Sequence, residues 1–181
     1  MIDISNYNNV SQLPFILMAV LTVDVIVLIL VRYFPDFFGK PINEWYDRFH
    51  LNAVLADVFI IFIGFLITRW LYTYMKWEWN PFYFLGLLLV VQLIHDLLFY
   101  VLVIKPIPYG HNSMMDVFKD YSVAGWKILV ADASMMIGSA LLTWFYLSLS
   151  GANFWSISSL IIYETPLYVP VVPINDVGTV F

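Results

Sequence analysis

The run PFILMAVLTVDVIVLILV, from Pro14 to Val31, gives the strongest indication of the fold class, because it is apolar apart from Thr22 and Asp24. About 20 predominantly apolar residues suffice for one helix to cross a hydrocarbon core of roughly 30 Å. A helix satisfies its backbone hydrogen bonds within the segment, as lipid requires. We therefore expect a transmembrane helix here, and not a cleavable signal peptide, since the residues before Pro14 contain no basic n-region.

Three further runs have the same character, and together they predict an all-α, four-transmembrane-helix bundle over residues 14–150. These runs are Leu51–Met75, Pro81–Ile104 and Ile128–Leu149. Residues 1–13 are expected to form an outer tail. In residues 151–181, the apolar stretch from Phe154 to Tyr163 is too short to span a membrane. We expect an interfacial turn of helix there, followed by an extended C-terminal arm from Glu164 to Phe181.

Composition excludes several classes of protein. Hydrophobic residues make up 62% of the chain and charged residues 12%, against about a quarter in soluble proteins. A net charge of −5 argues against nucleic acid as a partner. The chain has no cysteine, which excludes disulfides and thiolate chemistry. It also has no histidine–carboxylate motif typical of a metal site, so we predict no metal and no cofactor.

The basic residues predict an orientation. Three follow the first span and three follow the third, whereas only Arg69 and Lys76 lie near the turn from the second span to the third. Basic loops stay on the cytoplasmic side. We expect both termini outside, in an extracytoplasmic or lumenal compartment, and the two long loops inside.

The two halves of the bundle resemble each other. ADVFIIFIGFLIT, from Ala56 to Thr68, matches ADASMMIGSALLT, from Ala131 to Thr143, in length and in its first and last residues. This pattern favours a tandem duplication of a helical hairpin, although apolar helices also resemble one another by chance. Each inner loop contains an amphipathic stretch that predicts a short interfacial helix, with these apolar positions: Ile42, Trp45, Tyr46, Phe49, and Met114, Phe118, Tyr121.

Each span carries one aspartate: Asp24, Asp57, Asp96 and Asp132. At 1.5 Å per residue, all four lie roughly 6–12 Å from the inner ends of their spans. Acids inside a membrane indicate a functional site by default, so we predict ion or proton binding. For Asp57 and Asp132 a capping role near a helix start is an equal alternative.

Polar neighbours at helical spacing accompany the aspartates and predict that the carboxyls point into the bundle. His95 is adjacent to Asp96 but about 100° around the helix, so it shares the direction of Asp96 only in part. The supporting polar residues are Gln92, Tyr100, Thr68, Thr143, Ser139 and His95.

Three functions are compatible with this pattern. The first is a structural or assembly role, as a scaffold or anchor that contacts membrane lipid and binds a second copy or another membrane protein through its C-terminal arm. The alternative is a small proton- or cation-coupled transporter or channel that uses the aspartates. An intramembrane enzyme acting on lipid ranks last, because no catalytic motif is present.

The segments YFPDFFGKPINEWYDRFH, from Tyr33 to His50, and IKPIPYGHNSMMDVFKDY, from Ile104 to Tyr121, are rich in Asn, Tyr, Phe and Ile. In these features the chain resembles uncharacterised multi-span membrane proteins encoded by large DNA viruses of algae and protists. The resemblance extends over the whole chain and carries over no site residue. It implies a place in a virion membrane or an internal host membrane, and it favours the structural role.

Overall fold

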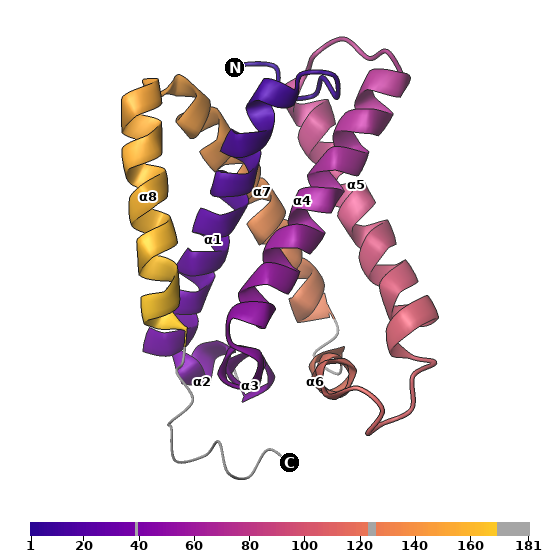
Figure 1. The fold of residues 1–181 in the computed structure, drawn as a ribbon. Coiled ribbons are helices and arrows are strands. Elements are labelled where there is room, and N and C mark those ends of the chain that lie inside the picture. The colour runs from indigo at the N-terminus through magenta and orange to yellow at the C-terminus, as the bar shows by residue number, and fades with distance from the viewer. Residues whose placement is uncertain (39, 123–125, 170–181) are drawn as a thin grey trace.

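The computed structural model describes residues 1–38, 40–122 and 126–169, and every regular element in them is a helix (Figure 1). The long elements are α1 (Leu13–Tyr33), α4 (Leu51–Tyr74), α5 (Pro81–Phe99) with its π-helical continuation η2 (Tyr100–Ile104), and α7 (Trp126–Ser148). The shorter ones are η1 (Val10–Gln12), α2 (Pro35–Phe38), α3 (Lys40–Phe49), α6 (Ser113–Ser122) and α8 (Gly151–Tyr168).

Four of these helices are long and apolar enough to cross a membrane: Val10–Tyr33, Leu51–Tyr74, Pro81–Ile104 and Leu129–Ser148. The predicted all-helical bundle with four candidate spans is therefore confirmed. Large apolar side chains such as Ile26, Phe59 and Ile94 remain about half exposed on the outside of these helices. Water would disfavour such a surface, whereas hydrocarbon accommodates it.

The four long helices form a closed ring in the order α1–α4–α5–α7. Helix α1 packs against α4 and α7, and α5 packs against the same two helices. Gly64 of α4 lies at the centre, where a Cβ atom would come within 2.6 Å of the Met136 Cε atom of α7. The missing side chain at Gly64 thus makes room for Met136, as small residues do where membrane helices approach each other.

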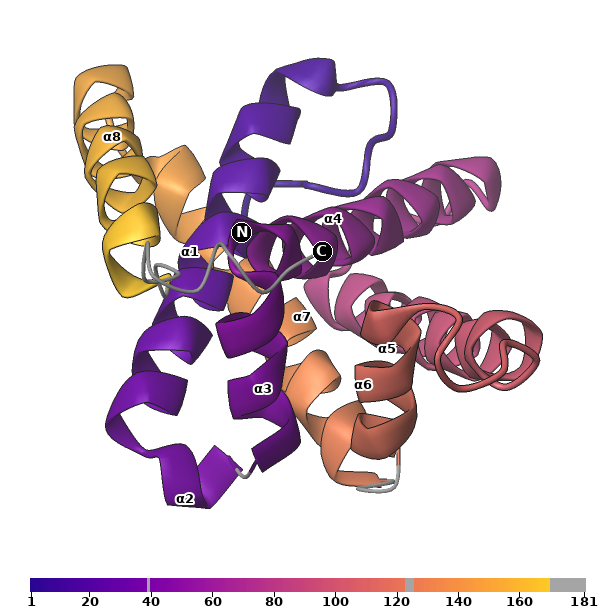
Figure 2. The same cartoon turned by 60° about the horizontal axis from the view of Figure 1, so that its bottom comes forward.

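The short helices α2, α3 and α6 lie at one end of the bundle, which we call the loop end (Figures 1 and 2). Helices α3 and α6 pack against each other, with the rings of Trp45 and Phe118 4.6 Å apart. Trp45, Tyr46 and Val117 of these helices are buried, while Ile42, Phe49, Met114 and Phe118 are partly buried against the core. Together the two helices cover the loop end.

The N-terminal residues lie at the opposite end, which we call the tail end (Figure 1). There α4 turns into α5 through Met75–Asn80, with Lys76 in the left-handed backbone region (φ 53°). The Asn80 side chain accepts hydrogen bonds from the backbone N–H groups of Phe82 and Tyr83, and Pro81 follows as the first helical residue. A capping asparagine followed by proline is a strong helix start, which explains why α5 begins at the predicted residue.

Helix α8 differs from the prediction. The expected extended arm from Glu164 is wrong up to Tyr168, because Gly151–Tyr168 form one helix with Pro166 near its end. The Ser150 side chain caps the helix and starts it before Phe154. Pro166 is tolerated because its missing N–H removes only one hydrogen bond close to the last turn. Residues 170–181 of the predicted arm lie outside the described residues.

Helix α8 runs beside α1 over the height of the bundle (Figure 1). Phe154, Ile157 and Ile161 pack there in a cluster with Met18 and Ala19 of α1. The C-terminal end of α8 consequently lies at the loop end, whereas the N-terminus of the chain lies at the tail end (Figure 1).

Candidate functional site

Two of the four aspartates meet at the loop end, beneath α3. The Tyr46 hydroxyl donates to Asp24 Oδ1 at 3.1 Å, and it lies 3.3 Å from Asp57 Oδ2. The Trp45 indole N–H also donates to Asp57 Oδ2, at 2.9 Å. Asp24 and Tyr46 are fully buried. We call Asp24, Tyr46 and Asp57, with Trp45, the Asp24–Asp57 cluster.

Helix α3 positions the two donors of this cluster. Its apolar face turns toward the bundle, so the adjacent residues Trp45 and Tyr46 enter the interior between α1 and α4. Burial, with the neighbouring carboxyls of Asp57 and Asp24, raises the pKa of the Tyr46 phenol well above its ordinary value. The hydroxyl therefore keeps its proton at neutral pH and serves as a donor to both acids.

Asp96 has a separate set of partners. The Gln92 side-chain amide donates to Asp96 Oδ1 at 2.7 Å, and His95 Nδ1 lies 3.2 Å from the same oxygen. The histidine therefore reaches Asp96 despite the angle between them, because both side chains can bend toward each other from adjacent positions. Asp96 Oδ2 and Asp24 Oδ2 are both buried without a hydrogen-bond partner.

The four aspartates do not form one ligand set. Asp132 is partly buried and close enough to Asp96 and Asp57 to interact with them electrostatically. Within residues 1–38, 40–122 and 126–169, no three histidine or carboxylate side chains converge in a way that could hold a metal ion.

Most of the predicted supporting residues do line the interior. Gln92, Thr68, Ser139 and Thr143 are buried. Thr68 donates to the Gly64 carbonyl and Thr143 to the Ser139 carbonyl, at 2.8 and 2.7 Å. Tyr100 is an exception, because it is 41% exposed. It directly follows α5, and its backbone N–H still donates to the Asp96 carbonyl.

The sequence analysis missed a second polar centre at the tail end, around Arg69. This side chain is fully buried, although its charge suggested an outer basic residue. Its Nη2 atom donates to the carbonyls of Asn6 and Asn9, the latter at 2.8 Å, and to Gln12 Oε1 at 3.3 Å. The sequence did contain a signal for this centre. A single arginine inside an apolar run needs hydrogen-bond partners, and this need predicts polar groups around it.

Residues Met1–Gln12, which we call the N-terminal cap, lie over this centre. Ile4 is fully buried, and Trp144 donates to the Ile2 carbonyl at 3.0 Å. The Thr73 hydroxyl donates to the Ser5 carbonyl at 3.2 Å. The expected outer tail is therefore an ordered cover that is bonded to the ends of α4 and α7.

Replacing Tyr46 by phenylalanine is expected to lower the free energy of unfolding by about 1–3 kcal/mol, because two buried carboxyls lose their shared donor. Unfolding by a denaturing detergent would measure the loss. Tyr109→Phe is the matched control, since Tyr109 is exposed and bonds Asp120 at 3.2 Å. An equal effect of both substitutions would contradict the structural importance of the Asp24–Asp57 cluster.

The Asp24–Asp57 cluster can do two things chemically. Two acids that share a neutral donor can fix the position of α3 against α1 and α4, or they can hold and exchange a proton. No protein-family model, no curated protein and no solved structure matches the chain.

Proposed function

We propose that the protein has a structural or assembly role, as a scaffold or anchor in a membrane. The observation that carries this proposal is the closure of both ends of the bundle by segments of the chain itself. At the tail end the N-terminal cap is bonded to Arg69, and at the loop end α3 is bonded to Asp24 and Asp57. These hydrogen bonds hold both covering segments against the bundle, which suits an anchor better than a pathway that must open.

A tandem duplication supports this role, because it gives a symmetric anchor. The ring order α1–α4–α5–α7 is the order expected when one hairpin is repeated about an axis along the membrane normal. The same axis would relate α3 to α6, and these two helices pack against each other. The hydroxyl bonds of Thr68 and Thr143 are also equivalent in the two halves.

For the orientation, we infer that the loop end faces the cytoplasm or its equivalent. Six of the eight basic residues lie in the loops at that end or at its helix termini. The N-terminal cap would then face outside. Because α8 returns to the loop end, the C-terminal end of this helix would lie on the inner side (Figure 1). The short helices α3 and α6 would lie along the inner surface of the membrane.

The resemblance to viral membrane proteins supports a place in a virion membrane or an internal host membrane. A scaffold there needs a contact beyond the bundle, and the C-terminal residues 170–181 supply the proposed one. Their partner is a second copy of the chain or another membrane protein.

Assembly can be tested in lipid vesicles by counting the copies per particle through stepwise photobleaching of a single fluorophore. The full chain is expected to form oligomers, and a chain ending at Val169 is expected to be monomeric with an unchanged unfolding transition. Monomers in both cases would contradict the assembly role. Oligomers of equal size in both would remove residues 170–181 from the contact.

Proton- or cation-coupled transport is the second candidate, and one observation favours it. Asp24 Oδ2 and Asp96 Oδ2 are buried acid oxygens without hydrogen-bond partners. Such groups are costly unless they are protonated or meet an ion during function.

Proton and cation flux in vesicles would separate the two candidates. Under the structural proposal, the purified protein is expected to give no flux across pH or cation gradients. The comparison is a double variant, Asp24→Asn with Asp96→Asn, and the matched control is Asp36→Asn in the exposed helix α2. Flux that persists in the control and is abolished in the folded double variant would establish transport and overturn the structural proposal.

A further inference from the structure

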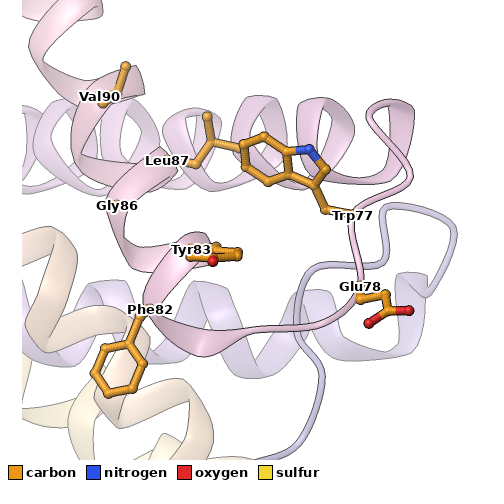
Figure 3. A pocket seen from close by; sticks show the side chains of 7 residues that line it. All are labelled: Trp77, Glu78, Phe82, Tyr83, Gly86, Leu87 and Val90. Carbon is orange, nitrogen blue, oxygen red and sulfur yellow. The ribbon is translucent and has the colours of Figure 1, made fainter.

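An open groove of about 530 Å³ lies at the tail end of α5, on the outside of the bundle. Trp77, Glu78 and Tyr83 line the part nearest the tail end, which we call the upper part. Gly86, Leu87 and Val90 line the part farther along α5, which we call the lower part. Figure 3 shows Trp77, Tyr83 and Leu87 around the groove, with Glu78 on the connecting loop beside Trp77. The lining is thus aromatic and acidic at one end and aliphatic at the other.

The upper part has the chemistry of a site for an organic cation. The rings of Trp77 and Tyr83 are 6.3 Å apart in an edge-to-face arrangement inclined by 65°, and both line this part of the groove. Aromatic faces attract quaternary ammonium groups, and tryptophan attracts them most strongly. Glu78 supplies a negative charge, and no described lining residue is basic.

The lower part is suited to an acyl chain. No atom lies within 4 Å of the position that a Cβ atom of Gly86 would occupy, so the groove stays open between Tyr83 and Val90. Val90 lies nine residues after Pro81, or roughly 14 Å deeper at 1.5 Å per residue. This depth is close to one leaflet, which is half of a core of about 30 Å.

We propose that this groove binds one phospholipid with a quaternary ammonium headgroup, a phosphocholine lipid of the leaflet at the tail end. The headgroup lies against Trp77, Tyr83 and Glu78, and one acyl chain follows Gly86, Leu87 and Val90. The span Pro81–Ile104 offers this surface because only 22% of its apolar 18-residue stretch is buried in the bundle. The inference depends on the membrane location of the chain and not on its scaffold role.

Native mass spectrometry of the full chain, released from mixed vesicles of phosphatidylcholine and phosphatidylglycerol with identical acyl chains, tests this site. Phosphatidylcholine is expected to be retained over phosphatidylglycerol by roughly tenfold, as a cation in an aromatic and acidic site implies. Glu78→Gln is expected to remove most of that preference. Gly86→Leu is expected to abolish retention, because the leucine fills the groove.

Gly151→Leu is the matched control, since a side chain there also meets open space. It is expected to retain phosphatidylcholine as the parent does. Equal retention of the two lipids by the parent, or unchanged retention in a folded Gly86→Leu variant, would overturn the proposal. Dissociation of an oligomer by Gly86→Leu, with lipid retention unaffected, would show instead that the groove contacts a second copy. A negative result in the photobleaching test of assembly would not change the lipid retention expected for the parent and these variants.

Discussion

Replacing Arg69 by alanine is expected to release the N-terminal cap and to give the largest loss of stability of any single substitution considered. The guanidinium donates to Asn6, Asn9 and Gln12, and its side chain is fully buried. Hydrogen bonds from a charged donor contribute about 1.5–3 kcal/mol each, while relief from burying the charge offsets part of this, so we expect a net loss of about 2–4 kcal/mol. Detergent-induced unfolding measures this loss.

Limited proteolysis of residues 1–12 in the Arg69→Ala protein would report the detached cap directly. Arg48→Ala is the matched control, because Arg48 is exposed and paired with Glu44 at 3.3 Å one helical turn away. Such a surface pair contributes only about 0.3–0.5 kcal/mol. Unchanged protease resistance in Arg69→Ala would show that Ile4 and the tryptophan contacts hold the cap without the arginine.

Replacing Gly64 by leucine is expected to force α4 away from α7 and to lower the free energy of unfolding by about 1–3 kcal/mol, the usual effect of overpacking. Even a Cβ atom at this position would lie 2.6 Å from Met136 Cε. The methionine can shift slightly, so Gly64→Ala is expected to cost less. The same detergent titration measures both variants.

Gly86→Leu is the control for this substitution, because it adds the same side chain to a glycine that faces open space. It is expected to leave the unfolding transition nearly unchanged. Met136→Ala, added to Gly64→Leu, is expected to recover part of the stability because it vacates the space that the leucine needs. A Gly64→Leu protein as stable as the parent would contradict the close contact between Gly64 and the Met136 side chain.

The four candidate spans were predictable because their length and apolar composition leave no other way to satisfy the backbone in lipid. Helix α8 was not predictable in the same way. Its sequence mixes serines, Asn153 and Glu164 with apolar residues, so composition alone made it look short. Its helical length depends on the Ser150 cap and on packing against α1, and packing is a tertiary effect.

The candidate site shows the same division. Asp24, Asp57, Asp96 and Asp132 stand out in the sequence because ionisable residues are rare in membrane spans. Which aspartates share a partner does not follow from the sequence, since Tyr46 reaches Asp24 and Asp57 only when α3 folds back across the loop end. His95 illustrates the limits of helical periodicity, because side-chain bending brings its ring to Asp96 although the two residues point in different directions around the helix.

The amino-acid sequence was sufficient to predict an all-helical membrane bundle, the four candidate spans and one acid in each span. These properties follow from transfer free energies, which depend on composition and length within a single segment. The ring order of the helices, the packing of α8 along α1, the N-terminal cap over Arg69 and the Asp24–Asp57 cluster became apparent only in the tertiary structure. These features depend on shape and hydrogen-bond partners that lie far apart in the chain, such as Arg69 and Asn9, and no local pattern encodes those pairings.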